Sequence, residues 1–340
     1  IPDMIDLIGR LEEKGLTYIA EGNVFFDTSR FVSYGQMALL DKQDLKAGAR
    51  IEVDLSKKNP ADFALWFTNS KFEHQAMMWD SPWGRGYPGW HIECSAMSMK
   101  YLGEQFDIHC GGVDHVPVHH TNEIAQAEGA TGGKWVNYWL HGEFLLTGKD
   151  KMAKSGENFL TLSALVEQGY DPLDYRYLNL GAHYRSQLQY SDDSMNSARS
   201  SRKSLMDRLI RLREQADPAE AGTLSEAALG YKAEFFSQLL HDLNAPKGLS
   251  TLWNMLKDNS ISGQEKLGCA FDMDRILGLR LAEGSNREDL LDADLQSLVD
   301  KREAARKNRD FALADDIRAQ LSEKGIDIED TPRGTRWQRR

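Results

Sequence analysis

The stretch Phe106–Glu128, FDIHCGGVDHVPVHHTNEIAQAE, decides the fold that we expect for this chain. Its first seven residues have the length of a short buried strand and end in two glycines. The pattern from His119 onward is typical of a helix, which we expect Gly129 and Gly132 to end. The preceding stretch, WDSPWGRGYPGWHIECSAMSMKYLG, changes from Pro/Gly turns to a helix of about ten residues. A second strand, NYWLHGEFL, follows the helix. This alternation of helices, strands and glycine-rich turns indicates an α/β fold with a parallel sheet.

Three side chains in and before this stretch are candidate metal ligands. His119 and Glu123 are four residues apart, so on a helix they share one face, with Cβ atoms about 5 to 6 Å apart. Cys94 lies in the preceding helix, and one strand and turn separate the two helices, so both can converge on the carboxyl end of the sheet. Thiolate, imidazole and carboxylate are zinc ligands. On spacing alone, however, such a His–Glu pair is usually a hydrogen-bonded surface pair, and such a cysteine is usually a small core residue. His120 points about 100° away from the shared face.

Composition limits the class of protein. The chain has 340 residues and a formal net charge of -11. As a whole it therefore repels polyanions, which argues against a protein that coats DNA nonspecifically. Local basic strips still act on their own, because charge is screened over about 10 Å. Its three cysteines are too few for a disulfide framework, and no run approaches the roughly 18 apolar residues of a membrane span. We therefore expect a cytoplasmic protein of two or three domains.

The rest of the chain changes character twice. An amphipathic pattern opens the sequence, and short alternating runs broken by glycine and proline follow from Thr17 to Arg85, which predicts a small β-rich unit. Beyond the second strand, apolar residues recur at spacings of three and four, as in an antiparallel helical bundle. The segment 301–340 holds more basic than acidic side chains. A basic end on an acidic protein indicates a local anionic partner.

A lysine-rich loop, GKDKMAKSGENFLT, follows the second strand and places Lys149, Lys151 and Lys154 ahead of a helix that Thr161 is expected to cap. Lysines in such a loop can offset the charge that develops on a triphosphate as pyrophosphate leaves. Alone, the same composition also fits an ordinary solvated loop.

Taken together, these stretches resemble cysteinyl-tRNA synthetase, a class I aminoacyl-tRNA synthetase. The resemblance runs in order over essentially the whole chain. Its carriers are PGWHIECSAM, FDIHCGGVDHVPVHHTNEIAQAE, NYWLHGEFL, the signature KMAKS, DLNAPKGLSTLW and DFALADDIRAQLSEKGIDIEDTPRGTRW. The fold implied is the second half of a Rossmann-like nucleotide-binding fold with a β-rich insertion, followed by an all-α bundle and a small C-terminal domain.

The resemblance assigns roles to particular residues. Cys94, His119 and Glu123 match three of the family's four zinc ligands, and this zinc is expected to bind the substrate sulfur. The family's fourth ligand, a cysteine, and its HIGH-type ATP motif have no counterpart in the sequence as written. Further positions match the family's functional residues: Trp90 and His91 in the amino-acid pocket, Gly111, Gly112 and Asp114 near the ATP ribose, and Lys151 and Lys154 in the KMSKS signature. Ala153 replaces a serine of that signature.

The resemblance also implies function and organisation. We expect ATP-dependent ligation of L-cysteine to its tRNA through a cysteinyl adenylate, with one zinc ion, with ATP accompanied by magnesium, and in a monomer. Because the first ATP motif is missing, we expect the chain as written to have little activity alone. Six segments are expected: catalytic-domain helix 1–16, connective insertion 17–85, second half of the catalytic domain 86–145, KMSKS loop and stem-contact region 146–175, helical bundle 176–290 and anticodon-end domain 291–340.

Two other functions stay open. One is a cysteine ligase of mycothiol synthesis, which joins cysteine to an amino sugar and uses the same zinc and adenylation chemistry without tRNA. The segment DFALADDIRAQL speaks against it. The other is a non-catalytic protein or fragment that binds zinc or RNA, and the missing first motif favours it. In the C-terminal segment, Arg318, Arg336, Arg339 and Trp337 suit RNA contact, although each arginine alone is also consistent with a solvated charge.

Overall fold

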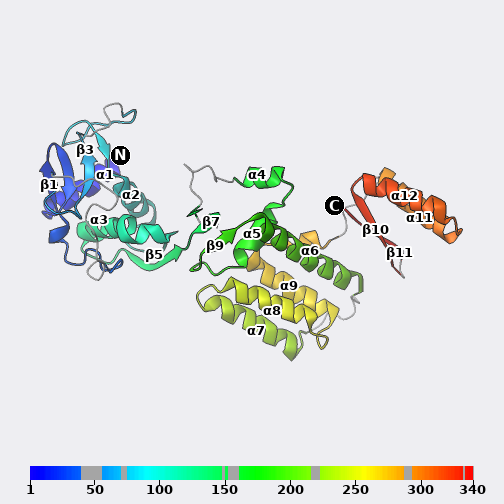
Figure 1. Ribbon diagram of the computed structural model, residues 1–340. Coiled ribbons are helices and arrows are strands. Elements are labelled where there is room, and N and C mark those ends of the chain that lie inside the picture. Colours follow the sequence, from blue (N-terminus) through cyan, green and yellow to red (C-terminus); the bar gives the residue numbers. More distant parts are fainter. Residues whose placement is uncertain are drawn as a thin grey trace. The chain divides into compact units, whose positions relative to one another are not determined.

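The computed structural model of the chain (Figure 1) describes residues 1–39, 56–69, 75–147, 150–151, 161–215, 223–286, 293–331 and 334–339. The chain divides into two compact units. One comprises Ile1–Ala164 with Ala182–Ser194, and the other comprises Leu165–Gly181 with Met195–Arg340. Within the described ranges, every helix is too short or too polar to span a bilayer.

An antiparallel sheet begins the first unit. Its strands β1 (Thr17–Ala20), β2 (Asn23–Phe26), β3 (Phe63–Phe67) and β4 (Tyr87–Pro88) pair in chain order. The β1–β2 hairpin turns at Glu21 and Gly22, which both have positive φ, as a two-residue turn between twisted strands requires. The predicted β-rich unit is therefore present in the described part of 17–85.

Helix α1 (Pro2–Glu13) packs on this sheet and shares one apolar core with it and with α2 (Trp90–Leu102) and α3 (Thr121–Thr131). Proline stands in the first turn of α1, where its missing N–H costs no hydrogen bond. Fully buried members of this core come from each element, including Ile8, Leu65, Trp66, Ile92 and Ala125. The antiparallel sheet thus supports the helices that carry Cys94 and Glu123.

The predicted parallel pairing is confirmed. β5 (Phe106–Gly112) and β6 (Val136–Gly142) run parallel, and α3 connects them. The expectation that Gly129 ends this helix is wrong: α3 continues to Thr131, and Gly132 in the left-handed conformation ends it. Gly129 lies inside the helix. A Cβ at this position would be 3.0 Å from Leu16 and 3.1 Å from Leu11, so the glycine allows α3 to pack closely against α1.

A short third sheet completes the first unit. It has the order β8 (Asp150–Lys151), β7 (Leu145–Thr147) and β9 (Leu188–Tyr190), with β7 and β9 parallel. Helix α4 (Leu162–Glu167) follows, and the hydroxyl of Thr161 accepts a hydrogen bond from the backbone of Ala164 at 3.1 Å. The predicted cap is therefore confirmed.

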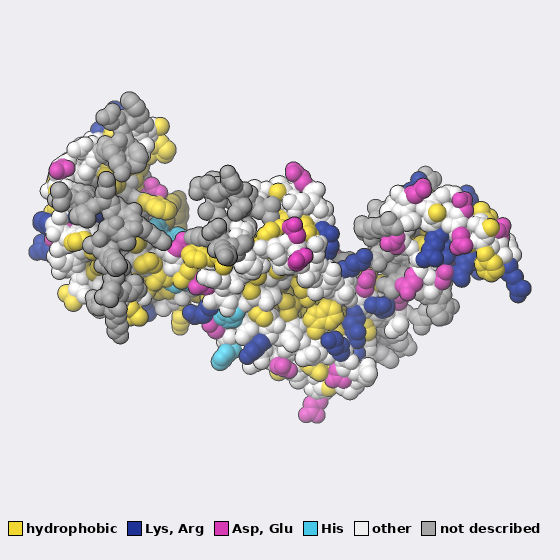
Figure 2. Space-filling model, in the orientation of Figure 1, with side chains coloured by type: hydrophobic (Ala, Val, Ile, Leu, Met, Phe, Trp, Pro, Cys, Tyr) yellow, Lys and Arg dark blue, Asp and Glu magenta, His cyan; other side chains and the backbone are white. Residues whose placement is uncertain are grey.

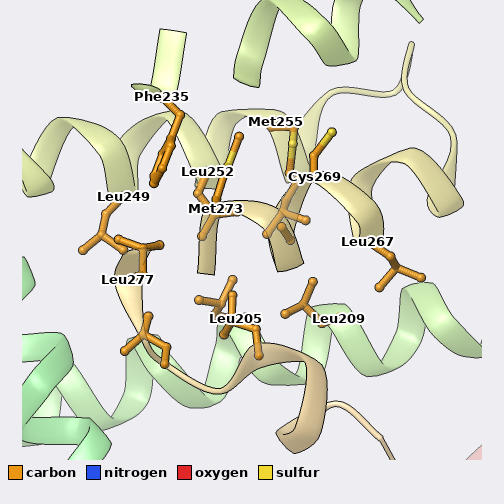
Figure 3. Packing of buried hydrophobic residues seen from close by; sticks show 14 of the residues in the cluster. Leu205, Leu209, Phe235, Leu249, Leu252, Met255, Leu267, Cys269, Met273 and Leu277 are labelled. Atoms are coloured by element: carbon orange, nitrogen blue, oxygen red, sulfur yellow. The ribbon is translucent and has the colours of Figure 1, made fainter. Parts of the chain in front are cut away.

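The second unit begins with a helical bundle, as predicted. Its helices are α5 (Pro172–Leu180), α6 (Asp192–Gln215), α7 (Glu226–Leu240), α8 (Ala245–Lys257), α9 (Gly263–Leu277) and α10 (Leu281–Gly284). In Figure 1 α7, α8 and α9 lie side by side. Figure 3 shows Leu205 and Leu209 of α6 directed toward side chains of α8 and α9, among them Leu252, Met255 and Met273. These side chains are completely buried, so they form the bundle's core.

The second unit ends with two helices and a hairpin. α11 (Ala293–Lys307) and α12 (Phe311–Glu323) enclose a small apolar core with β10 (Ile326–Thr331), which pairs antiparallel with β11 (Gly334–Arg339). Arg302 of α11 is 2% exposed and donates from both Nη atoms to Asp330 of β10, at 2.8 and 3.0 Å. Figure 2 shows Lys and Arg side chains, in dark blue, mixed with acidic ones over α11 and α12.

Candidate metal centre

The start of α2 and the turn that leads into α3 bring the candidate ligands together. Gly89 begins α2 in an extended conformation (φ -65°, ψ 149°), and its N–H donates to Leu65 of β3 at 2.8 Å, so the sheet fixes the start of the helix that carries Cys94. A π-helical turn (Val116–His120) leads directly into α3 and carries His119. Such turns are rare and occur often at functional sites.

Cys94, His119 and Glu123 meet as predicted from the spacing. One donor atom from each lies within 4.8 Å of the others. The side chain of Glu123 is completely buried, and its Oε1 is 2.9 Å from His119 Nε2. Nevertheless, Oε1 has no hydrogen-bond partner among the described residues. The two atoms are therefore close to one another without a hydrogen bond of good geometry.

These three residues fit a zinc ion by their chemistry. A thiolate, an imidazole nitrogen and a carboxylate oxygen are the donors that zinc prefers, and three protein ligands leave a fourth position open for a substrate. The buried Oε1 of Glu123 has no hydrogen bond of good geometry among the described residues, and a cation would give it a partner. The donor set therefore fits the metal that the sequence predicts.

Burial sets the protonation of these groups. It lowers the pKa of His119, although the nearby Glu123 carboxylate opposes the shift, so the ring is neutral and able to ligate at pH 7. Burial and the same carboxylate raise the pKa of the Cys94 thiol to about 11. A metal must therefore displace the proton of Cys94 when it binds.

Five more imidazoles surround the candidate ligands, and sequence reasoning gave only His91 a role. They are His91, His109, His115, His120 and His141. Burial lowers the pKa of His91 to about 4 and that of His120 to about 3. The neutral rings of His91 and His120 do not repel a cation, whereas charged rings would.

His120 points to a different group from His119, in agreement with their angular separation on the chain. Donor atoms of His120, His109 and Glu123 lie within 4.8 Å of one another. His120 Nδ1 already lies 2.8 Å from His141 Nε2, and the ring abuts Gly111, where a Cβ would be 2.5 Å from Cε1. The close approach of His120 to β5 therefore requires a glycine at position 111.

The structure describes some of the other predicted site residues. Trp90 is 71% exposed, and its ring centroid is 5.4 Å from that of His119. Gly112 ends β5, and Asp114 follows in a 3₁₀ turn, with its Oδ1 3.3 Å from His115 Nδ1. Lys151 belongs to β8, but its side chain lies outside the described residues, as do Lys149, Ala153 and Lys154.

Comparison with known proteins identifies the family. Residues 1–200 match the family model of the class I (C) tRNA synthetase catalytic domain, and residues 288–337 match that of the cysteinyl-tRNA ligase anticodon binding domain. The chain belongs to the cysteinyl-tRNA ligase family. Two curated relatives named cysteine–tRNA ligase, from Treponema denticola and Borreliella burgdorferi, are 47% and 43% identical to it. Each comparison covers 100% of this chain and 74% of the relative.

A solved structure supports the fold of this cysteinyl-tRNA ligase family member. Mycobacterium tuberculosis methionyl-tRNA synthetase in complex with methionyl-adenylate matches with a TM-score of 0.53 at 14% sequence identity. The match covers 84% of this chain and 72% of the other chain. The predicted class I synthetase fold, with a parallel α/β sheet followed by a helical C-terminal region, is confirmed.

Proposed function

We propose that the protein ligates L-cysteine to its tRNA through a cysteinyl adenylate, and that Cys94, His119 and Glu123 hold a zinc ion that selects the substrate thiol. The observation that carries this proposal is that donor atoms of the three residues lie within 4.8 Å of one another, and that the buried Oε1 of Glu123 has no hydrogen-bond partner among the described residues. When bound, zinc would supply a Lewis acid that prefers a thiolate to a hydroxyl as its open ligand.

This chemistry suits the discrimination of cysteine from serine. The two amino acids differ in one atom, which a hydrophobic pocket distinguishes poorly, whereas a strong contact that only one substrate makes discriminates by up to about 10⁴ to 10⁵. Cys94 is the ligand that gives the site its affinity for soft metals. Trp90, exposed beside His119, would cover the bound amino acid, and His91 would line the same pocket.

Other residues would hold ATP. We propose that Gly111, Gly112 and Asp114, at the carboxyl end of β5, bind the nucleotide where ligands of open α/β sheets bind. Lys151 and Lys154 would offset the charge on the phosphates as pyrophosphate leaves, with ATP bound as its magnesium complex. The reaction needs no side-chain nucleophile, since the substrate carboxylate attacks the α-phosphate.

The helical part would bind tRNA. We propose that the bundle 176–290 contacts the body of the tRNA and that 291–340 contacts its anticodon end, in a monomeric cytoplasmic enzyme. The match of residues 288–337 to an anticodon binding domain favours this function over the ligase that joins cysteine to an amino sugar, which uses no tRNA.

Amino-acid binding tests the proposal without requiring ATP. The zinc-loaded chain is titrated calorimetrically with L-cysteine and with L-serine. We expect binding of cysteine and no measurable binding of serine, and we expect Cys94→Ser to abolish the cysteine signal. Cys110→Ser is the matched control, because Cys110 is exposed and outside the ligand group. Equal binding of the two amino acids, or unchanged cysteine binding by Cys94→Ser, would contradict the proposal.

A further inference from the structure

Two of the candidate metal ligands, His119 and Glu123, are each contacted by a further histidine. His91 Nδ1 lies 2.8 Å from His119 Nδ1, and His109 Nε2 lies 2.9 Å from Glu123 Oε2. The other two atoms, His119 Nε2 and Glu123 Oε1, are 2.9 Å apart, and Oε1 has no hydrogen-bond partner among the described residues. We call His119 Nδ1 and Glu123 Oε2, which the two histidines contact, the outer atoms of the ligands. His119 Nε2 and Glu123 Oε1 are then the inner atoms, which are left for an ion.

The contact with His91 fixes the tautomer of His119. A hydrogen bond between two ring nitrogens needs one N–H and one lone pair. If His119 offers the lone pair of Nε2 to an ion, its proton is on Nδ1 and must be donated to His91 Nδ1. His91 then carries its own proton on Nε2. The same contact holds the plane of the His119 ring.

The contact with His109 fixes the carboxylate of Glu123. His109 comes from β5, and its ring packs against Trp135 and Trp139, with centroid separations of 5.4 and 4.9 Å. A ring confined in this way can donate Nε2–H to Glu123 Oε2 in one direction only. Because the Glu123 side chain is completely buried, this bond decides which oxygen is offered to the ion.

We propose that His91 and His109 are positioning residues of the metal site, each holding one ligand by a hydrogen bond to its outer atom. The inference rests on the metal site of the proposed function and extends it to the residues that support the ligands. Loss of such a supporting hydrogen bond lowers metal affinity by about 10- to 100-fold.

A second ion held by His109, His120 and Glu123 is the competing interpretation, since their donor atoms also lie within 4.8 Å of one another. The surroundings of His120 favour the positioning role instead. Its Nδ1 is paired with His141, and the ring edge that carries Nε2 abuts Gly111. Neither nitrogen of His120 is well placed for an ion.

The two contacts use different ring nitrogens, which provides a crossed test. Asparagine places its amide near the position of a histidine Nδ1, and glutamine places its amide near that of Nε2. We expect His91→Asn and His109→Gln to keep zinc affinity within about 3-fold of wild type. We expect the exchanged variants, His91→Gln and His109→Asn, to lose about 10- to 100-fold. Affinity is measured by competition with a chromophoric chelator.

Controls separate the possible failures. His241→Asn changes an exposed histidine at the end of α7 and should leave zinc affinity unchanged. Circular dichroism and urea unfolding of every variant show whether the fold is kept. If wild type binds no zinc, the proposed metal site fails. If wild type binds zinc and Cys94→Ser does not, but the crossed pattern is absent, the positioning roles alone fail.

Cobalt decides between the positioning role and the second ion. We expect one cobalt per chain, with a thiolate-to-cobalt absorption band that disappears in Cys94→Ser. Binding of a second cobalt without such a band, lost specifically in His109→Asn, would make His109 a ligand and overturn the proposal.

Discussion

Gly89→Ala tests whether the antiparallel sheet positions the metal site. Gly89 has an ordinary extended backbone, so alanine causes no conformational strain there. A Cβ at this position would instead lie 2.1 Å from the carbonyl oxygen of Ala64 and 3.0 Å from its carbonyl carbon. These atoms belong to β3, which is paired on both sides, so they cannot move without disturbing the sheet.

The expected cost has two parts. Overpacking against fixed atoms costs about 1 to 3 kcal/mol, and loss of the Gly89–Leu65 hydrogen bond adds about 1 kcal/mol. We therefore expect Gly89→Ala to lower the free energy of unfolding of the first unit by roughly 2 to 4 kcal/mol. The start of α2 must also shift, so zinc affinity should fall because Cys94 follows in the next turn.

Urea unfolding followed by tryptophan fluorescence measures this cost, because all tryptophans except Trp253 and Trp337 lie in the first unit. Gly9→Ala is the matched control. Gly9 lies inside α1, and no atom is within 4 Å of the position that a Cβ would take, so alanine should stabilise the unit by up to about 1 kcal/mol. An unfolding midpoint for Gly89→Ala equal to or above that of wild type would refute the reasoning.

Three further predictions concern the second unit. Leu252→Ala should destabilise the bundle by about 2 to 5 kcal/mol in thermal unfolding, whereas Leu240→Ala, at a position 88% exposed, should change stability by less than about 0.5 kcal/mol. Hydrogen bonds from the side chain and backbone of Ser225, and then from the backbone of Ser262, lower the pKa of Glu265 to about 2, so its stabilisation is present above about pH 4.5 and is lost toward pH 2. Glu265→Gln should flatten the acid dependence of bundle stability in this interval, by less than about 1 kcal/mol because the carboxyl is open to water. Asp330→Asn should cost about 1 to 3 kcal/mol, seen as faster hydrogen exchange in β10 and β11, because buried Arg302 loses its ionic partner; unchanged exchange would contradict this.

The sequence was sufficient to predict the parallel sheet and the meeting of three ligands. A strand that ends in glycines between two helices permits few other arrangements, and His119 and Glu123 are neighbours because helical geometry is local. Cys94 could be added because one strand and turn separate the two helices, so both can converge on the carboxyl end of the sheet.

The imidazoles around the ligands could not be predicted in the same way. His109, His141 and His91 come from three separate elements. The β5–β6 register, which pairs His109 with Trp139 and Gly111 with His141, determines where His109 and His141 lie relative to one another. Spacing along the chain does not give that register. The continuation of α3 through Gly129 also depends on tertiary packing, since the glycine is needed against α1 and does not end the helix.

The most direct test of the account is X-ray absorption at the zinc edge of the zinc-loaded chain, with and without L-cysteine. We predict that cysteine adds one sulfur neighbour at about 2.3 Å to the zinc shell and that serine adds none. A zinc shell that is the same with and without L-cysteine would contradict the claim that this metal site selects the substrate by its sulfur.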